Sequence, residues 1–507
     1  MLARLRSAAV LGIDAYPVDV EVDLTNGLPS FATVGLPQGA VKEGRERVAA
    51  ALVNSGLEFP LRRITVNLAP ADVRKEGSAF DLPIALGVLA ANGQLPAAAV
   101  NGQVFLGELG LQGDLRPVRG ALSMALAARQ IGASALILPA ANLAEAAVVD
   151  SLQVIGAETL LQVLRHLTGA APIAPARAAP SSLLVAPGPE AADLADVGGQ
   201  LAAKRALEVA AAGGHNLLLI GPPGAGKTML ARRLPSILPA LTLEEAIEIT
   251  RVHSVAGLLP SGAALLTSRP FRAPHHTISD AGLVGGGSSP RPGEVSLAHG
   301  GVLFLDELPE FHRHVLEVLR QPLEDGVVTL SRAAARLTFP ARFTLVAAMN
   351  PCPCGHLGGA RPCHCSPALI ERYLGRISGP LLDRIDMHLR VPALPYSDLA
   401  GEAQAESSAA IRARVDGARA RQRVRFRAHR GLFANAHMSS REVRRHCRQT
   451  PEIAELMGQA VERLGLSARG CHRVLKVART IADLAGVEQL EPAQVREAIQ
   501  YRKLSST

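Results

Sequence analysis

The residues with the most specific chemistry form one segment that matches the phosphate-binding pattern G-x-x-x-x-G-K-[ST]. Glycines let backbone N–H groups approach phosphate oxygens, the lysine neutralises the terminal phosphates, and the threonine hydroxyl reaches Mg²⁺. The apolar run Leu217 to Ile220 before the segment predicts a strand, and the residues from Met229 predict a helix whose N-terminus faces the anion. A fortuitous glycine-rich turn is the alternative, but these flanking elements favour binding of ATP with Mg²⁺. The segment is Gly221, Pro222, Pro223, Gly224, Ala225, Gly226, Lys227 and Thr228.

Two further apolar runs end in polar side chains that suit ATP hydrolysis. The run Val302 to Leu305 is followed by Asp306 and Glu307, about 80 residues after the phosphate-binding segment. We expect Asp306 to hold Mg²⁺ and Glu307 to polarise the attacking water, although two acids after a strand are often only a capped turn. The run Phe343 to Met349 ends in Asn350, which is placed to orient that water unless it is merely a turn residue.

Four cysteines lie within fourteen residues directly after Asn350, and they are Cys352, Cys354, Cys363 and Cys365. Four soft ligands in a reducing compartment favour a structural Zn²⁺ site, which would order a loop rich in proline and glycine. The C-x-C spacing departs from the usual metal-site spacing, so free or redox-labile thiols are the alternative. His356 and His364 are candidate substitute ligands.

The elements that must position these residues alternate between short strands and longer helical segments. This alternation predicts an α/β fold with a parallel sheet flanked by helices. A length of 507 residues, 48% of them hydrophobic, suggests about three domains and excludes wholesale disorder. We expect an N-terminal α+β domain at 1–168, a Pro/Ala-rich linker at 169–190, an ATPase core at 191–395 and an arginine-rich helical lid at 396–507.

Composition also bears on compartment and partners. We find no signal peptide and no uninterrupted run of 18 apolar residues, so we expect a cytoplasmic protein without membrane spans. The net charge is +8, and Ile411 to Arg430 holds eight arginines against one acid. Such a block indicates an anionic partner, most plausibly DNA, although a solvated helix face is the simpler interpretation.

Two segments near the strands are further candidates for DNA contact. The insert Pro270 to Gly300 contains His275 and His276, which lack the spacing of a metal site, so we expect a flexible loop facing a pore. Val327 to Arg332 and Arg336 to Phe339 predict a hairpin whose arginines could bind phosphates or simply face solvent.

Together these residues resemble the AAA+ ATPases of the magnesium-chelatase type, and within them the ComM-like (YifB-like) group. The similarity covers nearly the whole chain. It is carried by Asp196-Val197-Gly198-Gly199-Gln200, Ala203-Lys204-Arg205-Ala206, Phe271-Arg272-Ala273-Pro274-His275-His276-Thr277 and Leu381-Leu382-Asp383-Arg384-Ile385-Asp386.

The resemblance assigns roles to three side chains. It makes Asn350 the sensor 1 residue, Arg384 the arginine finger that completes a neighbouring subunit's site, and Arg469 the sensor 2 residue, with Arg473 as the substitute candidate. An arginine finger typically contributes about 10³ to 10⁵ in rate, and its supply in trans requires a ring, which we expect to be a hexamer. Ordinary salt bridges are the alternative roles for Arg384 and Arg469.

Residues 64–149 resemble the proteolytic domain of Lon, a family that uses a Ser-Lys dyad. Aligning Lys75-Glu76-Gly77 with the family's Lys-Asp-Gly segment places Ala79 at the nucleophile position and Leu122 at the lysine position. Ser78 is one residue away, and Leu122 cannot activate it. We therefore expect an inactive Lon-like domain that supports assembly or binds a partner.

The combined prediction is a ring-forming, Mg²⁺-dependent ATPase that moves DNA. The resemblance to the ComM-like group implies helicase or branch-migration activity in recombination and natural transformation. One alternative is the ATPase subunit of a magnesium chelatase, which remodels a tetrapyrrole-metallating partner. A second is a regulatory scaffold whose ATP turnover only switches assembly.

Overall fold

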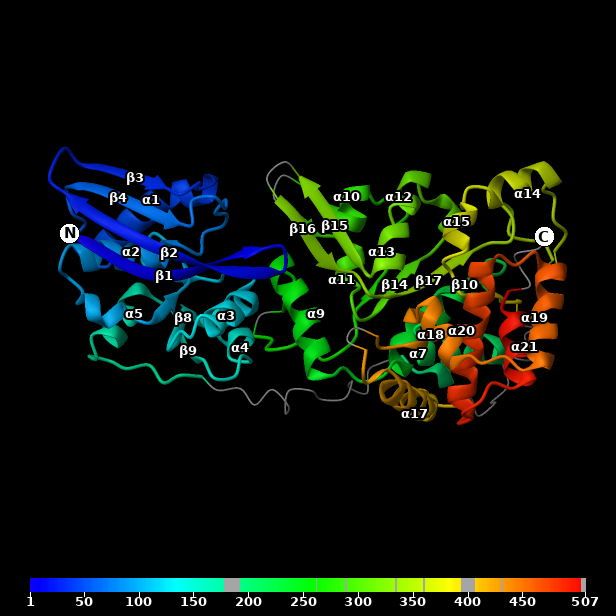
Figure 1. Ribbon diagram of the computed structural model, residues 1–507. Coiled ribbons are helices and arrows are strands. Elements are labelled where there is room, and N and C mark those ends of the chain that lie inside the picture. Colours follow the sequence, from blue (N-terminus) through cyan, green and yellow to red (C-terminus); the bar gives the residue numbers. More distant parts are fainter. Residues whose placement is uncertain are drawn as a thin grey trace. The chain divides into compact units, whose positions relative to one another are not determined.

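A computed structural model describes residues 1–176, 192–260, 262–287, 290–332, 335–358, 361–393, 406–429 and 432–502 (Figure 1). The chain forms two compact units. The first comprises the described residues of Met1–Val185, Thr242–Thr267 and Ser331–Phe339, and the second those of Ala186–Leu241, Ser268–Leu330 and Pro340–Thr507. Most of the expected linker, residues 177–190, and the expected boundary at 395 lie outside the described residues.

The first unit is built on a seven-stranded mixed sheet with the order β3-β4-β2-β1-β5-β8-β9. Alternating burial along β1 and β2 gives the sheet one apolar face, which packs on helices. The strands are β1 (Leu2–Leu11), β2 (Asp14–Thr25), β3 (Ser30–Val34), β4 (Arg63–Ala69), β5 (Gln103–Phe105), β8 (Ala135–Pro139) and β9 (Gln153–Ala157), with a separate pair β6 (Glu108–Leu109) and β7 (Leu115–Arg116). The helices are α1 (Gly39–Asn54), α2 (Asp81–Ala91), α3 (Ala121–Gln130), α4 (Leu143–Ala146) and α5 (Leu160–Leu167).

Helix α9 (Leu243–Ala256) belongs to this first unit although it follows the phosphate-binding segment in the sequence. Ser254 Oγ donates a 2.5 Å hydrogen bond to the buried Glu145 carboxylate, and Arg251 pairs with Asp14. Burial raises the pKa of Glu145. The boundaries expected from the sequence place this helix in the ATPase core, whereas these contacts join it to the N-terminal fold.

The second unit contains a five-stranded parallel sheet with the order β11-β14-β17-β10-β18. The three inner strands are almost wholly buried, which explains their continuous apolar sequences. The strands are β11 (Phe271–Arg272), β14 (Val302–Leu305), β17 (Thr344–Met349), β10 (Leu217–Ile220) and β18 (Met387–Arg390). The expected α/β class with a parallel sheet is confirmed.

Helices surround this sheet and extend into the C-terminal region (Figure 1). Ser467 caps α20 by accepting the Gly470 N–H, and Gly486 ends the helix. The helices around the sheet are α7 (Leu201–Gly213), α8 (Lys227–Ile237), α10 (Asp280–Val284), α11 (Glu294–Leu297), α12 (Arg313–Glu317), α13 (Arg320–Asp325), α14 (Pro367–Leu374) and α15 (Gly379–Leu382). The C-terminal helices are α17 (Ser408–Phe426), α18 (Ser440–His446), α19 (Pro451–Leu464), α20 (Ala468–Ala485) and α21 (Pro492–Gln500).

Two smaller features complete the description. The predicted hairpin is confirmed, since β15 (Val327–Arg332) pairs with β16 (Ala335–Pro340). The insert expected to be a flexible loop instead contains β11, α10, α11 and the pair β12 (Gly285–Gly286) and β13 (Arg291–Pro292). Within this insert, Arg272 of β11 donates two 2.6 Å hydrogen bonds to Glu294 of α11. Within the described residues, every helix is too short or too polar to cross a lipid bilayer.

Candidate nucleotide site and its arginines

The phosphate-binding segment connects β10 to α8 at the carboxyl edge of the parallel sheet. Gly224 and Gly226 have φ angles of +77° and +84°, which residues with a Cβ rarely adopt. At Gly221, an added Cβ would lie 2.2 Å from the Val391 carbonyl oxygen, so only glycine fits beside that strand end. The glycines thus meet the backbone requirement of a loop that encloses phosphates with its N–H groups.

Lys227 lies at the start of α8 and points back across the loop. Its Nζ donates to the carbonyl oxygens of Gly221 at 2.7 Å and Pro222 at 2.9 Å, and to Asn350 Oδ1 at 3.1 Å. Desolvation by burial lowers its pKa, while the nearby Asp306 and Glu307 oppose that shift. The ammonium group is nearly buried, and within the described residues its hydrogen bonds go to neutral oxygens, which a phosphate can replace with full charge compensation.

The predicted magnesium ligands meet at the ends of neighbouring elements. Thr228 Oγ1 donates a 2.6 Å hydrogen bond to Asp306 Oδ2, which brings the hydroxyl and the carboxylate together. Both are the oxygen ligands that Mg²⁺ prefers, so the residues fit the cation that ATP would bring. The chain thus brings Lys227, Thr228, Asp306 and Asn350 to one edge of the sheet, as the strand ends predict.

Glu307 follows Asp306 in an uncommon backbone conformation, with φ +52° and ψ +46°. A non-glycine residue in the left-handed region is costly and occurs often at functional sites. Asp306 Oδ1 accepts the Glu307 N–H at 2.9 Å, and the Glu307 side chain is exposed. The Glu307 carboxylate is therefore accessible to solvent water.

His276 is a site residue that the sequence interpretation missed. Its Nδ1 lies 3.5 Å from Glu307 Oε2, and its ring contacts Phe311 edge-on at 6.3 Å between centroids. The signal was present in the Phe271 to Thr277 signature, but adjacent histidines suggested only a metal or a pore loop. The imidazole is placed to orient the Glu307 carboxylate.

Arg384, the expected arginine finger, is 5% exposed in this single chain. Its guanidinium donates to the Pro380 carbonyl oxygen at 2.6 Å and forms an ion pair with Glu324. Glu324 lies on α13, two residues before Gly326, which leads into the β15–β16 hairpin. The sequence alone gave no sign of this carboxylate, because the pairing joins segments 60 residues apart.

Arg469, the expected sensor 2 residue, lies near the same carboxylate. Its Nη1 is 4.0 Å from Glu324 Oε1, and its side chain is 72% exposed. The two expected phosphate-sensing arginines thus share Glu324. Arg473, the substitute candidate, is instead anchored, because its Nη1 donates to the Arg384 carbonyl oxygen at 3.1 Å and pairs with buried Asp386.

Hydrogen bonds of Asn216 and Asp386 hold the backbone at Arg384 in place. Asn216 Nδ2 donates to the Arg384 carbonyl oxygen at 3.1 Å, and its Oδ1 accepts the Leu345 N–H at 2.8 Å. Asp386 Oδ2 accepts the Asn216 N–H at 3.0 Å. Burial alone would raise the pKa of Asp386, but Arg473, His215 and Lys476 together outweigh it and hold that pKa far below its usual range.

The four clustered cysteines converge after β17. The Cys352 sulfur lies 3.4 Å from that of Cys354 and 3.7 Å from that of Cys363, and the Cys354 and Cys363 sulfurs are 3.6 Å apart. All four ligand atoms, including that of Cys365, lie within 4.8 Å of one another. Tetrahedral zinc with bonds of about 2.3 Å places its sulfurs about 3.8 Å apart, so the donor set fits zinc, while a disulfide needs about 2 Å.

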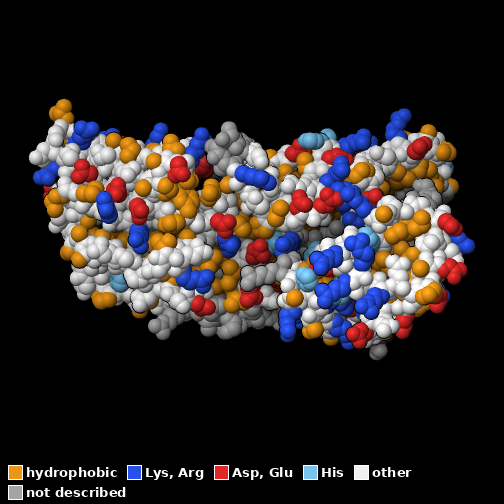
Figure 2. Space-filling model, in the orientation of Figure 1, with side chains coloured by type: hydrophobic (Ala, Val, Ile, Leu, Met, Phe, Trp, Pro, Cys, Tyr) orange, Lys and Arg blue, Asp and Glu red, His pale blue; other side chains and the backbone are white. Residues whose placement is uncertain are grey.

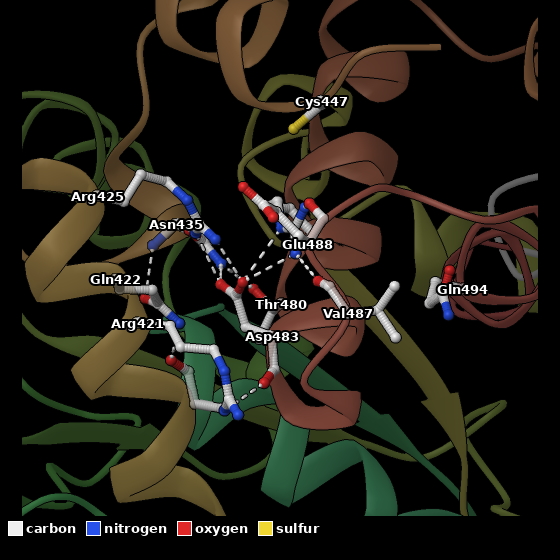
Figure 3. A network of polar contacts seen from close by, with 12 residues as sticks. Arg421, Gln422, Arg425, Asn435, Cys447, Thr480, Asp483, Val487, Glu488 and Gln494 are labelled. Carbon is white, nitrogen blue, oxygen red and sulfur yellow. Dashed lines mark hydrogen bonds and ion pairs between the residues drawn. The ribbon is translucent and has the colours of Figure 1, made fainter. Parts of the chain in front are cut away.

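The arginine-rich segment forms α17, and most of its described arginines bond to other groups of the protein. Figure 3 shows Arg421, Arg425 and Asn435 directed at the Asp483 residue. Arg425 Nη1 and Asn435 Nδ2 each donate to the Asp483 carboxylate at 2.8 Å, and Arg421 donates to the Asp483 carbonyl oxygen at 3.0 Å. Asp483 is fully buried. Further bonds to protein groups are made by Arg412, Arg414 and Arg419.

The expected basic patch on residues 411–430 is partly exposed, and several of its guanidinium groups also bond to protein carbonyl and carboxylate oxygens. Arg430 lies outside the described residues. Exposed arginines also lie on α18, beside the end of α17, where the Phe426 and His446 rings contact each other. Figure 2 shows Lys and Arg side chains concentrated over α17, α18 and α20. The exposed arginines of this region are Arg414, Arg421, Arg423, Arg427, Arg441, Arg444, Arg445 and Arg448.

In the first unit, the Lon-like positions are occupied as the sequence predicts. Leu122 is fully buried, and its N–H donates to Glu145. Ser78 Oγ donates to Glu108, while the Nζ of fully buried Lys75 has no hydrogen-bond partner among the described residues. Ser78 thus contacts a carboxylate rather than a lysine.

Comparisons with known proteins agree with this arrangement. Family descriptions match residues 193–399 ("Magnesium chelatase, subunit ChlI"), 20–142 ("Subunit ChlI of Mg-chelatase") and 405–502 ("Magnesium chelatase, subunit ChlI C-terminal"). The chain is 47% identical to the Competence protein ComM of Haemophilus influenzae over 99% of this chain and 98% of that protein. It is 46% identical to the YifB protein of Salmonella typhimurium over 99% and 97%.

A more distant similarity concerns Lon protease 2 of Bacillus subtilis, at 34% identity over 27% of this chain and 26% of that protein. It supports the Lon-like character of the N-terminal region. Full-length identity, the three family matches and the phosphate-loop geometry lead to one conclusion. The chain belongs to the ComM and YifB group of magnesium-chelatase-type AAA+ proteins.

Proposed function

We propose that this protein is a ring-forming, Mg²⁺-dependent ATPase that uses hydrolysis to move DNA. The observation that carries the hydrolytic part is the convergence of Lys227, Thr228, Asp306 and Asn350, with the exposed Glu307 directly after Asp306. Lys227 binds the terminal phosphates, and Thr228 and Asp306 hold the cation. Asn350 orients the attacking water, and Glu307 accepts its proton while His276 orients the carboxylate.

The site is completed by a second copy of the chain. Within the described residues, the Arg384 guanidinium bonds to Pro380 and Glu324 rather than to the chain's own phosphate loop. Arg384 therefore acts on the neighbouring subunit's ATP in a homo-oligomeric ring, which we propose is a hexamer. Arg469, beside the same carboxylate, contributes to the same junction as the sensor 2 residue.

Mixed rings test this arrangement. Arg384→Ala and Lys227→Ala subunits are each expected to be inactive, because one lacks the finger and the other cannot bind phosphate. A mixture creates interfaces that contain both intact residues, so ATPase activity should partly return. Stable mixed rings that remain inactive, with mixing verified by mass spectrometry, would count against a finger supplied in trans.

DNA is the proposed substrate for movement. The exposed arginines of α18 and the end of α17 form a basic surface suited to phosphates. Similarity to a protein named for competence favours branch migration or helicase action during recombination and natural transformation in the cytoplasm. The alternative, a magnesium-chelatase ATPase subunit, is supported by the family matches.

The deciding experiment follows ATP-dependent migration of three- and four-stranded DNA junctions, with Glu307→Gln as the hydrolysis-deficient control. Movement by wild type alone supports the DNA motor. Stimulated porphyrin metallation without junction movement supports the chelatase function, and slow ATPase activity indifferent to nucleic acid supports a regulatory scaffold.

Two further assignments accompany the motor. The four cysteines bind a structural Zn²⁺, for which metal analysis of purified protein is the direct test. The Lon-like domain has no peptidase activity, because Ser78 faces Glu108 and Leu122 occupies the position of the base. We expect casein to remain undegraded when it is incubated with the wild-type protein or with Ser78→Ala.

A further inference from the structure

The loop that carries the four cysteines begins immediately beside the nucleotide site. Cys352 is only two residues from Asn350, whose side chain accepts a hydrogen bond from Lys227 at 3.1 Å. Cys352 is completely buried, and its sulfur accepts the Leu357 N–H at 3.4 Å. The position of Asn350 is therefore fixed on one side by β17 and on the other by the first cysteine of the cluster.

The same loop touches the phosphate-binding segment directly. Gly355, between the second and third cysteines, has φ +81°, and its N–H donates to the Cys352 carbonyl oxygen at 2.9 Å. A Cβ built at Gly355 would lie 2.5 Å from Pro223 Cδ, 2.9 Å from Pro223 Cγ and 3.9 Å from Asn350 Cγ. The backbone of the cysteine loop thus rests on the phosphate loop without space for one more carbon atom.

This contact depends on an ordered cysteine loop. The loop is rich in glycine and proline, and its cysteines come from two arms, Cys352 with Cys354 and Cys363 with Cys365. A metal ion shared by both arms holds such a loop in one conformation, whereas uncoordinated thiols contribute only weak hydrogen bonds. Loss of the metal therefore frees the segment that presses on Pro223 and carries Asn350.

We propose that Zn²⁺ bound by the four cysteines controls the affinity of the neighbouring nucleotide site. The inference rests on the proposed ATPase function and adds a metal dependence to it. With the metal bound, Gly355 supports Pro223, and Asn350 stays within reach of Lys227 and the terminal phosphate. Because coupling between two sites is reciprocal, bound nucleotide also raises the affinity for the metal by the same factor.

Two glycines of the loop provide a matched pair of variants. Gly355 and Gly358 have similar φ angles, +81° and +71°, so alanine causes comparable backbone strain at both. A Cβ at Gly358 meets nothing within 4 Å, whereas a Cβ at Gly355 strikes Pro223. We expect Gly355→Ala to bind a fluorescent ATP analogue about tenfold more weakly than Gly358→Ala, with one zinc per chain retained in both.

Metal removal provides a second test. Removal of zinc from the wild-type protein by a chelator should weaken nucleotide binding, and Cys363→Ser, which loses the metal, should weaken it to a similar degree. The control Cys447→Ser, at an isolated cysteine, should keep wild-type metal content and affinity. Release of zinc to a colorimetric chelator should be slower with the ATP analogue present. This readout does not depend on ATPase activity or on any variant folding correctly.

The outcomes separate this inference from the proposed function. Purified protein without zinc, or zinc-stripped protein with unchanged nucleotide affinity and release kinetics, overturns the inference. Equal affinities of Gly355→Ala and Gly358→Ala also count against it. If Lys227→Ala binds the analogue as well as wild type does, the nucleotide site itself is wrong, and the proposed function fails independently of the metal.

Discussion

Replacement of Glu324 by glutamine should lower the ATP concentration at which subunits assemble into rings. In the single chain, the Glu324 carboxylate holds Arg384 and lies 4.0 Å from Arg469 Nη1. Both arginines must leave this carboxylate to reach a neighbour's phosphates. The ion pair therefore opposes assembly, and glutamine weakens it while preserving the side chain's size and one hydrogen-bond acceptor.

The size of the effect follows from exposure. The Arg384 side chain is 6% exposed, but that of Glu324 is 46% exposed, so solvent screens the pair. A hydrogen bond to a charged group contributes about 1.5–3 kcal/mol, and screening places this one at or below the lower limit. A loss of about 1 kcal/mol corresponds to roughly a fivefold shift in the midpoint.

Sedimentation velocity across a titration with a non-hydrolysable ATP analogue measures this midpoint. Glu317→Gln is the matched control, because Glu317 pairs with Arg320 at 2.9 Å on neighbouring helices, whereas Arg384 pairs with Glu324. The shift should vanish in the Arg384→Ala background. An unchanged or higher midpoint in Glu324→Gln would refute the reasoning, because it would mean that the carboxylate orients the arginines for the neighbour instead of withholding them.

Three further outcomes test other parts of the molecule. Glu307→Gln should keep ATP binding but lose at least about 10²-fold in hydrolysis, measured by phosphate release, because the general base is gone. Arg444→Ala with Arg445→Ala should weaken DNA binding for all sequences and reduce the salt dependence by about one unit of slope per lost phosphate contact, whereas Arg425→Ala should lower the unfolding temperature instead. Asp386→Asn should reduce the fall in the free energy of unfolding between neutral and acid pH, measured by urea titrations at several pH values. The folded pKa of Asp386 lies below its unfolded value near 4, so its stabilising contribution is present above that pH and is lost on acidification.

The nucleotide site could be predicted from the sequence because parallel strands impose it. Leu217–Ile220, Val302–Leu305 and Thr344–Met349 are short, apolar and flanked by helices, so their carboxyl ends share one edge of a sheet. Asp306 and Asn350, which follow two of those ends, must then lie near Lys227. Local pattern and global topology agree at these positions, which makes the expectation secure.

Contacts that depend on distant segments could not be predicted in the same way. The arginines of α17 suggested a nucleic-acid surface, but Arg425 pairs with buried Asp483, 58 residues later, while other arginines of α17 and those of α18 are exposed. Glu324, His276 and the attachment of α9 to the N-terminal fold likewise depend on three-dimensional proximity that no periodicity encodes.

The attachment of Asn216 connects the phosphate-binding segment to Arg384 within one chain. Its side chain holds the Arg384 backbone, and four residues of rigid strand, about 13 Å, separate it from the phosphate loop that begins at Gly221. In the ring that we propose, a displacement at one subunit's phosphate loop would pass along β10 to that subunit's own Arg384, and through it to the ATP of the neighbour.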